Sequence, residues 1–93
     1  TGADMDKKLN QPSDVFVDER HAEIYVVDAG NRRVVVFDMD GFYEYQFALP
    51  GESGSPSSLV VNDRGEILVA MGGRVAVCDF RGSVLEYVDF EGF

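Results

Sequence analysis

Histidine and cysteine, the side chains best suited to act as nucleophiles, bases or metal ligands, each occur once in this chain. His21 lies beside Arg20 and close to Glu23 in a predicted turn, where a solvated histidine is much more common than a metal ligand. Cys78 ends an apolar run and is expected to be a small, buried core residue. Since no histidine is near Cys78 in the sequence, nothing there would activate its thiol. We therefore expect no catalytic residue.

Carboxylates and glycines offer two weaker candidates for binding chemistry. Asp38 and Asp40, beside Gly41, could hold Ca²⁺, but the same pattern is typical of an ordinary turn. Gly72 and Gly73 precede a predicted strand rather than a helix, unlike a phosphate-binding loop. The sequence thus predicts no metal, no cofactor and no enzymatic activity. The serines near the middle of the chain also lack a candidate base, and they are Ser53, Ser55, Ser57 and Ser58.

The charge of the chain excludes two classes of partner. The 93 residues carry 17 acidic and 8 basic side chains, a formal net charge of −9. This balance repels phosphate backbones and anionic lipids, so we expect neither nucleic-acid binding nor membrane binding. A single cysteine also rules out an internal disulfide and the zinc motifs that are built on several cysteines.

Short apolar runs rich in Val, Ile, Tyr and Phe, bounded by Asp, Asn or Gly, are typical of β-strands. No window has helical periodicity. Short turns join most of the runs, which predicts antiparallel pairing of consecutive strands. The expected strands are Val15–Val17, Ile24–Val27, Val34–Phe37, Phe42–Phe47, Leu59–Val61, Ile67–Ala70, Val75–Cys78 and Val84–Val88.

Two of these runs indicate a sheet that is covered on both faces. Ile24–Val27 and Val34–Phe37 are apolar throughout, with no alternating polar residues. Continuous apolar strands indicate that both faces are buried, whereas a β-sandwich would place polar residues at every outward position. An antiparallel sheet flanked by similar sheets is the arrangement inside a β-propeller.

One pattern occurs twice along the chain. Its spacing of about 41 to 44 residues, filled with short strands, is the period of a propeller blade and not of a helical solenoid. The chain is therefore expected to be all-β, with two four-stranded antiparallel blades. Pro12–Asp18 returns as Pro56–Asn62, Glu23–Val27 as Glu66–Ala70, and Arg33–Asp38 as Arg74–Asp79.

The repeat divides the chain into three parts. Residues 1–10 are expected to be an inter-blade connector, residues 11–50 the first blade and residues 51–93 the second blade. Residues 48–57, which include Pro50, Gly51, Gly54 and Pro56, link the two blades.

The residues between strands have mechanical roles in turns. An aspartate at the end of a strand accepts hydrogen bonds from the free N–H groups of the next turn. Glycine is expected at positive φ, and asparagine tolerates the same region. The arginine that opens the third strand of each unit could pair with a nearby aspartate. We assign structural turn roles to Asp28, Gly30, Asn31, Arg33, Asp38 and Gly41.

Residues 24–41 resemble the NHL repeat. At almost every position they match the family pattern, which is Ile-Tyr-Val-x-Asp-x-Gly-Asn-x-Arg-Val-x-Val-Phe-Asp-x-x-Gly. The second unit departs from this pattern, because residues 71–73 form a shorter loop. The family's glycine two residues after the proline is Asp14 in one unit and Ser58 in the other. The resemblance covers about residues 9–90 and implies a third of a six-bladed propeller, with one four-stranded blade per repeat.

Two blades leave two apolar faces uncovered. A four-stranded face has a footprint of roughly 300 Å², near the largest apolar patch that soluble monomers usually show. Covering one contact removes at least ~600 Å², on the order of 15 kcal/mol before association costs. The two free faces differ, so they would meet head to tail and close into a ring. We expect a cyclic homotrimer. The second alternative is that the chain is a piece of a longer propeller that is a sensor or a scaffold. The third is that it is a piece of a lyase or a hydrolase.

A protein or small-ligand partner is expected on the face where the second-to-third strand turns meet the inter-blade connectors. The resemblance implies this position, because propeller ligands usually bind on the tunnel-lining face. Enzymes that resemble NHL propellers place metal-binding histidines around the tunnel, and the shortage of histidine here favours a non-enzymatic module. The predicted face consists of Asn10, Gln11, Asn31, Arg32, Ser57, Met71 and Gly72.

Overall fold

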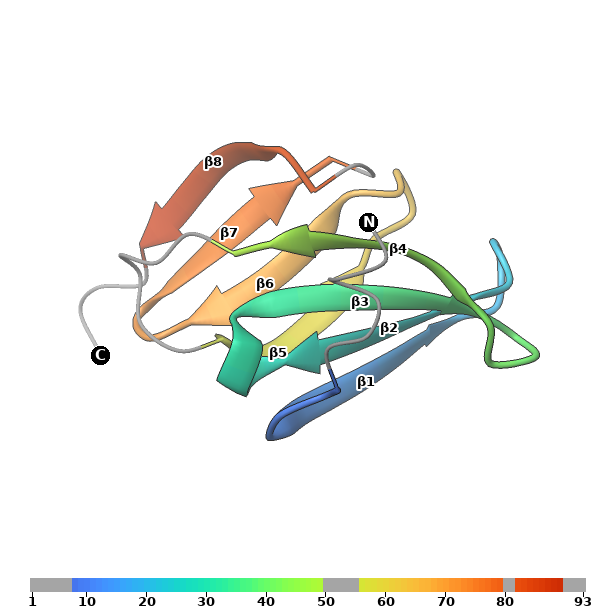
Figure 1. Ribbon diagram of the computed structural model, residues 1–93. Helices are drawn as coiled ribbons and strands as arrows, with labels where there is room; N and C mark the ends of the chain where they lie inside the picture. Colours follow the sequence, from blue (N-terminus) through green and yellow to red (C-terminus); the bar gives the residue numbers. More distant parts are fainter. Residues whose placement is uncertain (1–7, 50–55, 80–81, 90–93) are drawn as a thin grey trace.

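The strands of this protein pair in the order in which they occur along the chain (Figure 1). The computed structural model describes residues 8–49, 56–79 and 82–89, which form two four-stranded antiparallel sheets. The prediction of an all-β fold with two four-stranded antiparallel blades is therefore confirmed. The first sheet contains β1 (Pro12–Asp18), β2 (Glu23–Asp28), β3 (Arg33–Asp38) and β4 (Tyr43–Ala48), and the second contains β5 (Pro56–Val61), β6 (Ile67–Met71), β7 (Arg74–Cys78) and β8 (Val84–Asp89).

Each expected strand is present, with small differences at its ends. β1 begins at Pro12, before the apolar run, because Pro12 pairs with Asp28 at the end of β2. β4 begins one residue later than expected, at Tyr43, next to a register shift in its pairing with β3. Within the described ranges, no helix has the length and apolar character that crossing a membrane requires.

The first strands of the two sheets lie side by side. The hydroxyl of Ser13 in β1 donates to the carbonyl of Pro56 in β5 at 3.3 Å. The N–H of Leu59 in β5 donates to the carboxylate of Asp14 at 3.0 Å. In a propeller the first strands of successive blades surround the central axis, so this contact is the one that two neighbouring blades require.

The core lies between the two sheets. Side chains alternate across a strand, so each sheet contributes one set of alternate residues to this layer. Branched aliphatic residues at the centres of the strands fill it, as a half-buried pleated surface favours. The cluster of buried residues consists of Tyr25, Val27, Val34, Val36, Phe47, Leu49, Leu59, Ile67, Val69, Met71, Ala76 and Cys78.

Gly82 should be harder to replace than Gly65, although both are turn glycines at positive φ. It has a φ of +87°, and a Cβ added to it would collide with the ring of Phe47 in the other sheet. Gly65 has a similar φ of +80°, but no atom of the residues that the structure describes lies within 4 Å of its Cβ position. We expect Gly82→Ala to lower the free energy of unfolding by about 1–3 kcal/mol more than Gly65→Ala, because only Gly82→Ala overpacks the core.

Urea denaturation of the two variants at one protein concentration measures this difference. Equal costs for Gly82→Ala and Gly65→Ala would show that backbone strain alone matters at these turns and that the contact with Phe47 is not tight.

Candidate functional site

One buried carboxylate organises the end of the molecule that carries the β2–β3 turn. Asp28 is fully buried and accepts hydrogen bonds from the N–H of Asn10 at 2.7 Å, from Nδ2 of Asn31 at 2.8 Å and from Nε of Arg33 at 2.7 Å. Arg33 is also buried and donates to Oε1 of Gln46 at 2.7 Å. Such charge-assisted bonds are stronger than bonds between neutral groups. Asp28 thus joins the chain before β1 to the β2–β3 turn and to β3.

Two residues of this turn differ from their predicted conformations. Gly30 is not at positive φ. A glycine is needed at this position because the N–H of Gly30 donates to the carbonyl of Asn10 at 2.7 Å, and this close approach leaves no room for a Cβ. Arg32, and not Asn31, takes the left-handed conformation, at φ 51°. Asn31 lies in the 3₁₀ turn η1 (Ala29–Asn31) and donates to the carbonyl of Lys8 at 2.9 Å. The close approach of the preceding chain imposes these conformations.

The β3–β4 turn uses a carboxylate for its own backbone. Oδ1 of Asp38 accepts the N–H groups of Asp40 and Phe42, both at 2.9 Å, and Gly41 has a φ of +90°. These bonds are those of a turn, in which short carboxylates commonly accept nearby N–H groups. In the part of the chain that the structure describes, no three His, Cys, Asp or Glu side chains lie close enough together to hold a metal ion.

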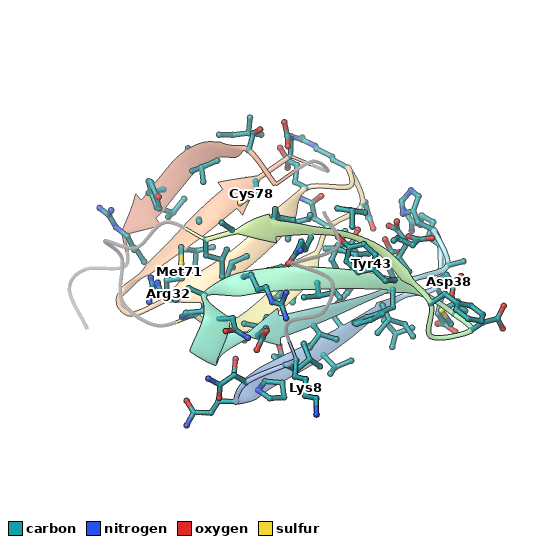
Figure 2. The ribbon with its side chains drawn as sticks, viewed as in Figure 1. Lys8, Arg32, Asp38, Tyr43, Met71 and Cys78 are labelled. Atoms are coloured by element: carbon teal, nitrogen blue, oxygen red, sulfur yellow. The ribbon has the colours of Figure 1, made fainter. Side chains whose placement is uncertain are left out.

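The residues predicted for a binding face lie at one end of the molecule. β1 and β5 begin there and β2 and β6 end there, and Figure 2 shows Arg32 and Met71 at this end and Asp38 at the other. Gln11 and Gly72 are exposed, and the exposed Ser57 donates to the carbonyl of Ala70 at 3.4 Å. Met71, in contrast, is fully buried in the core, so it contributes little to the exposed surface of this end. Asn10 and Asn31 have the structural contacts of the Asp28 network.

Acid should weaken the fold through Asp28. Burial by itself raises the pKa of Asp28, but hydrogen bonds from Asn31, from the Asn10 N–H and from Arg33, with the charge of Arg33, outweigh burial and hold the pKa below its usual value. A carboxylate with a lowered pKa stabilises the folded state fully above its unfolded pKa, and this contribution is lost as the pH falls through the folded pKa. We expect Asp28→Asn to flatten the decline of the free energy of unfolding below about pH 4, measured by urea denaturation.

The outcome that contradicts this account is a decline of the same steepness in Asp28→Asn and in the unchanged protein. Asp63→Asn is the matched control, because Asp63 is an exposed carboxylate whose pair with Arg20, at 3.4 Å, lies on the surface. Exposed pairs contribute little to stability, so its acid profile should match that of the unchanged protein.

A cavity of about 660 Å³ opens between the two sheets at the end opposite the Asp28 network. β1, β2 and β4 of the first sheet, together with β5 and the turn after it, contribute its walls. Its volume falls in the range of small-molecule sites in proteins. The lining residues are Asp18, His21, Glu23, Tyr25, Tyr45, Val61, Arg64 and Gly65.

Two acidic side chains face this cavity in different environments. Asp18 is 8% exposed, and its carboxylate meets Nδ1 of His21 at 2.8 Å and accepts the His21 N–H at 3.3 Å. Glu23 accepts the hydroxyl of Tyr25 at 2.9 Å. Buried carboxylates require hydrogen-bond donors or positive charges around them. The partner of Asp18, His21, supplies positive charge only when it is protonated.

The phenols of the cavity are held in their neutral form. Burial, together with hydrogen bonds to Tyr45 and Glu23, raises the pKa of Tyr25 far above its usual value. Burial and the nearby charges of Glu23 and Glu44 raise the pKa of Tyr45. The pKa of Glu44 is itself raised, first through a hydrogen bond with Glu23. The closeness of these two acidic side chains indicates a negative potential at this end of the molecule.

Sequence reasoning did not find this cavity. The prediction that His21 lies in the turn between the first two strands is confirmed, and its side chain is about half exposed. However, the cavity walls combine residues from both repeats that are far apart in the sequence, such as Tyr25 and Val61. The sequence contains one local signal, which is that His21 follows the strand-ending Asp18 by three residues.

Cys78 has the surroundings of an inert core residue. It is fully buried, as predicted. Burial, with the nearby charge of Asp79, raises the pKa of the Cys78 thiol to about 11. A thiol with a raised pKa is a poor nucleophile because little thiolate forms near neutral pH.

Equivalent residues of the two repeats are buried in opposite patterns. Leu59 is 2% exposed, whereas its equivalent Val15 is 57% exposed. Phe16 packs against the core, whereas its equivalent Val60 is 50% exposed. The first sheet therefore buries one face of the blade and the second sheet buries the other. We call the face of each sheet that points away from the other sheet its free face, the first free face belonging to the first sheet and the second to the second sheet. The partly or fully exposed apolar residues of the first free face include Val15, Val17, Ile24 and Phe37, and those of the second include Val60, Leu68, Val75, Val77 and Val88.

Solved structures with similar folds support a β-propeller architecture. A streptogramin B lyase superposes with a TM-score of 0.74 at 12% sequence identity, over 94% of this chain and 29% of that chain. A luciferin-regenerating enzyme superposes with a TM-score of 0.66 at 21% identity, over 84% of this chain and 29% of that one. A protein of unknown function from Bacteroides caccae superposes with a TM-score of 0.63 at 20% identity, over 92% and 31%.

At these identities the likeness shows the fold alone. This chain spans about a third of the length of each of these neighbours. No protein-family model matches the chain, and no curated relative is similar to it in sequence.

Proposed function

We propose that this chain is a two-blade unit of an NHL-type β-propeller, that three copies close into a six-bladed ring, and that the ring acts by binding and not by catalysis. The observation that carries the proposal is the opposite burial of equivalent residues. The first free face corresponds to the face that the second blade buries inside the chain, and the second free face corresponds to the face that the first blade buries. The contact between the two blades of one chain can therefore be repeated between chains.

The two free faces complement each other in shape at one further position. No atom of the described residues lies within 4 Å of a Cβ position on Gly41, whereas the ring of Phe47 covers its equivalent, Gly82. The equivalent of Phe47 in the second blade is Val88, which is exposed. In the proposed ring Val88 of the next copy fills the open space over Gly41. Since the two faces differ, the contact is head to tail, and such contacts form rings when the rotation closes.

Binding without catalysis is supported by the chemistry of the described residues. The thiol of Cys78 is buried with a raised pKa, and His21 forms a local pair with Asp18 in a turn. In the proposed ring a protein or small ligand is bound at the predicted face, to which Gln11, Asn31 and Arg32 belong.

A second candidate follows from the lengths of the structural neighbours. Because the chain spans about a third of each neighbour, it also fits a part of one longer NHL-type propeller that is a sensor or scaffold. In that case the remaining blades belong to the same polypeptide and the free faces do not contact further copies.

Chemical cross-linking of the purified chain at micromolar concentration separates the two candidates. A closed ring gives covalent dimers and trimers and no larger species as the reagent increases. A ladder that continues beyond trimers would contradict ring closure, and a chain that stays monomeric would contradict self-assembly.

A further inference from the structure

We propose that the cavity between the two sheets binds a small organic amine. Asp18 and Glu23 accept the ammonium group, and the apolar body of the ligand lies against Tyr25, Tyr45 and Val61. All of these residues belong to one chain, so the site does not depend on the proposed ring. The cavity is also at the opposite end from the predicted binding face.

The size and walls of the cavity suit such a ligand. About 660 Å³ holds a molecule of drug-like size or smaller. The lining combines an apolar and aromatic wall with a few convergent polar groups, which is the usual composition of small-molecule sites. The wall comes from the strands of both sheets, and such elements position side chains more rigidly than long loops do.

The charge of Asp18 argues for a cation. Its side chain is only 10% exposed, and its ion pair is with His21, which carries a positive charge only when protonated. A buried carboxylate is costly without a positive partner or several donors. An ammonium group supplies both, because it has a full charge and up to three N–H donors.

Glu23, the second acidic side chain of the cavity, has a further negative charge near it. Glu23 accepts the Tyr25 hydroxyl through one oxygen, Oε1, and lies close to Glu44. Glu23 and Glu44 therefore place like charges close together. A bound cation relieves this repulsion. Arg64, the arginine among the lining residues, is exposed, and an exposed guanidinium repels an ammonium only weakly in water.

The tyrosines determine what kind of amine fits. Both phenols stay neutral, so their rings and the side chain of Val61 present an apolar wall instead of a further charge. Aromatic rings also attract cations that lie over their faces. The preferred ligand is therefore an amine with an aromatic or aliphatic body, and not an inorganic cation.

Three probes of nearly equal size test the proposal. Phenethylamine, 2-phenylethanol and phenylacetate share the same ring and differ in charge, and NMR titration at neutral pH measures the binding of each to the unchanged protein. We expect saturable binding of phenethylamine, binding of 2-phenylethanol weaker by about tenfold or more, and no saturation with phenylacetate. Resonances of Tyr25 and Tyr45 should shift with the amine.

Two variants and a control locate the site. We expect Glu23→Gln and Asp18→Asn each to weaken the binding of phenethylamine by about tenfold, because a charge-assisted hydrogen bond is lost while the shape of the side chain is kept. Asp63→Asn removes the same charge from an exposed carboxylate outside the lining and should leave binding unchanged. Far-UV circular dichroism shows whether each variant is folded.

Several results would overturn the proposal. Equal binding of the amine and the alcohol would mean that the cavity selects only apolar bodies, and preferred binding of phenylacetate would mean that Arg64 selects the ligand. Equal weakening by Asp63→Asn and by Glu23→Gln would mean that the net charge of the protein, and not this cavity, attracts the amine. Absence of saturation with all three probes would exclude the site.

Discussion

Replacing Asp28 by alanine is expected to lower the free energy of unfolding by about 3–5 kcal/mol, a large part of the stability of a domain of this size. The loss leaves Arg33 as a buried charge without its carboxylate partner at 2.7 Å. It also removes the acceptor of the Asn10 N–H and of the Asn31 amide. Urea denaturation followed by circular dichroism measures the change.

Asp38→Ala is the matched control for this prediction. Asp38 also accepts two hydrogen bonds in a turn, from the N–H groups of Asp40 and Phe42, but it is only partly buried. We expect a cost of about 1 kcal/mol for Asp38→Ala. The double variant with Arg33→Ala should recover part of the loss caused by Asp28→Ala, because no unpaired charge then stays buried. A cost for Asp28→Ala no greater than that for Asp38→Ala would contradict the structural role of this network.

A charge placed on either free face should abolish assembly. Val15→Asp changes the first free face and Val60→Asp changes the second, at positions that are 57% and 50% exposed in one chain. In the proposed ring each new carboxylate would be buried without a partner, at a cost that weakens the contact by about a thousandfold or more. Each variant alone should be monomeric by sedimentation velocity at concentrations where the unchanged chain assembles.

Mixing the two variants tests the head-to-tail arrangement. Val15→Asp leaves the second free face intact, and Val60→Asp leaves the first intact, so one productive contact forms between them. We expect the mixture to contain heterodimers and no trimers. Met39→Asp is the control, because Met39 is an exposed apolar residue of the β3–β4 turn and not of a free face. Trimers formed by either variant alone would show that the free faces are not the contact.

Most of the fold could be predicted from the pattern that occurs twice along the chain. Apolar runs bounded by turn residues located the strands of both sheets, because strand periodicity and turn chemistry are local properties. The conformations of Gly30 and Arg32 could not be predicted, since the approach of Asn10 to this turn is a tertiary contact. The burial of Met71 was missed for a related reason, because a residue at the end of a strand faces core or solvent according to the register.

The sites were less predictable than the fold. The cavity depends on the distance between two sheets and on side chains from both repeats, so no single stretch of sequence contains it. The sequence predicted that two apolar faces stay uncovered. Which residues each face exposes became clear only from the register of the strands. Val15 and Leu59 occupy equivalent positions and are similar in character, yet one is exposed and the other buried. The difference in burial between Val15 and Leu59 arises from the order of the two blades and not from the side chains themselves.

The mass of the unchanged chain in solution tests the central claim most directly. Sedimentation equilibrium at micromolar concentration should give a single species of three times 10.3 kDa, the mass of one chain. A species of 10.3 kDa that persists at this concentration, with both free faces in contact with water, would contradict the account.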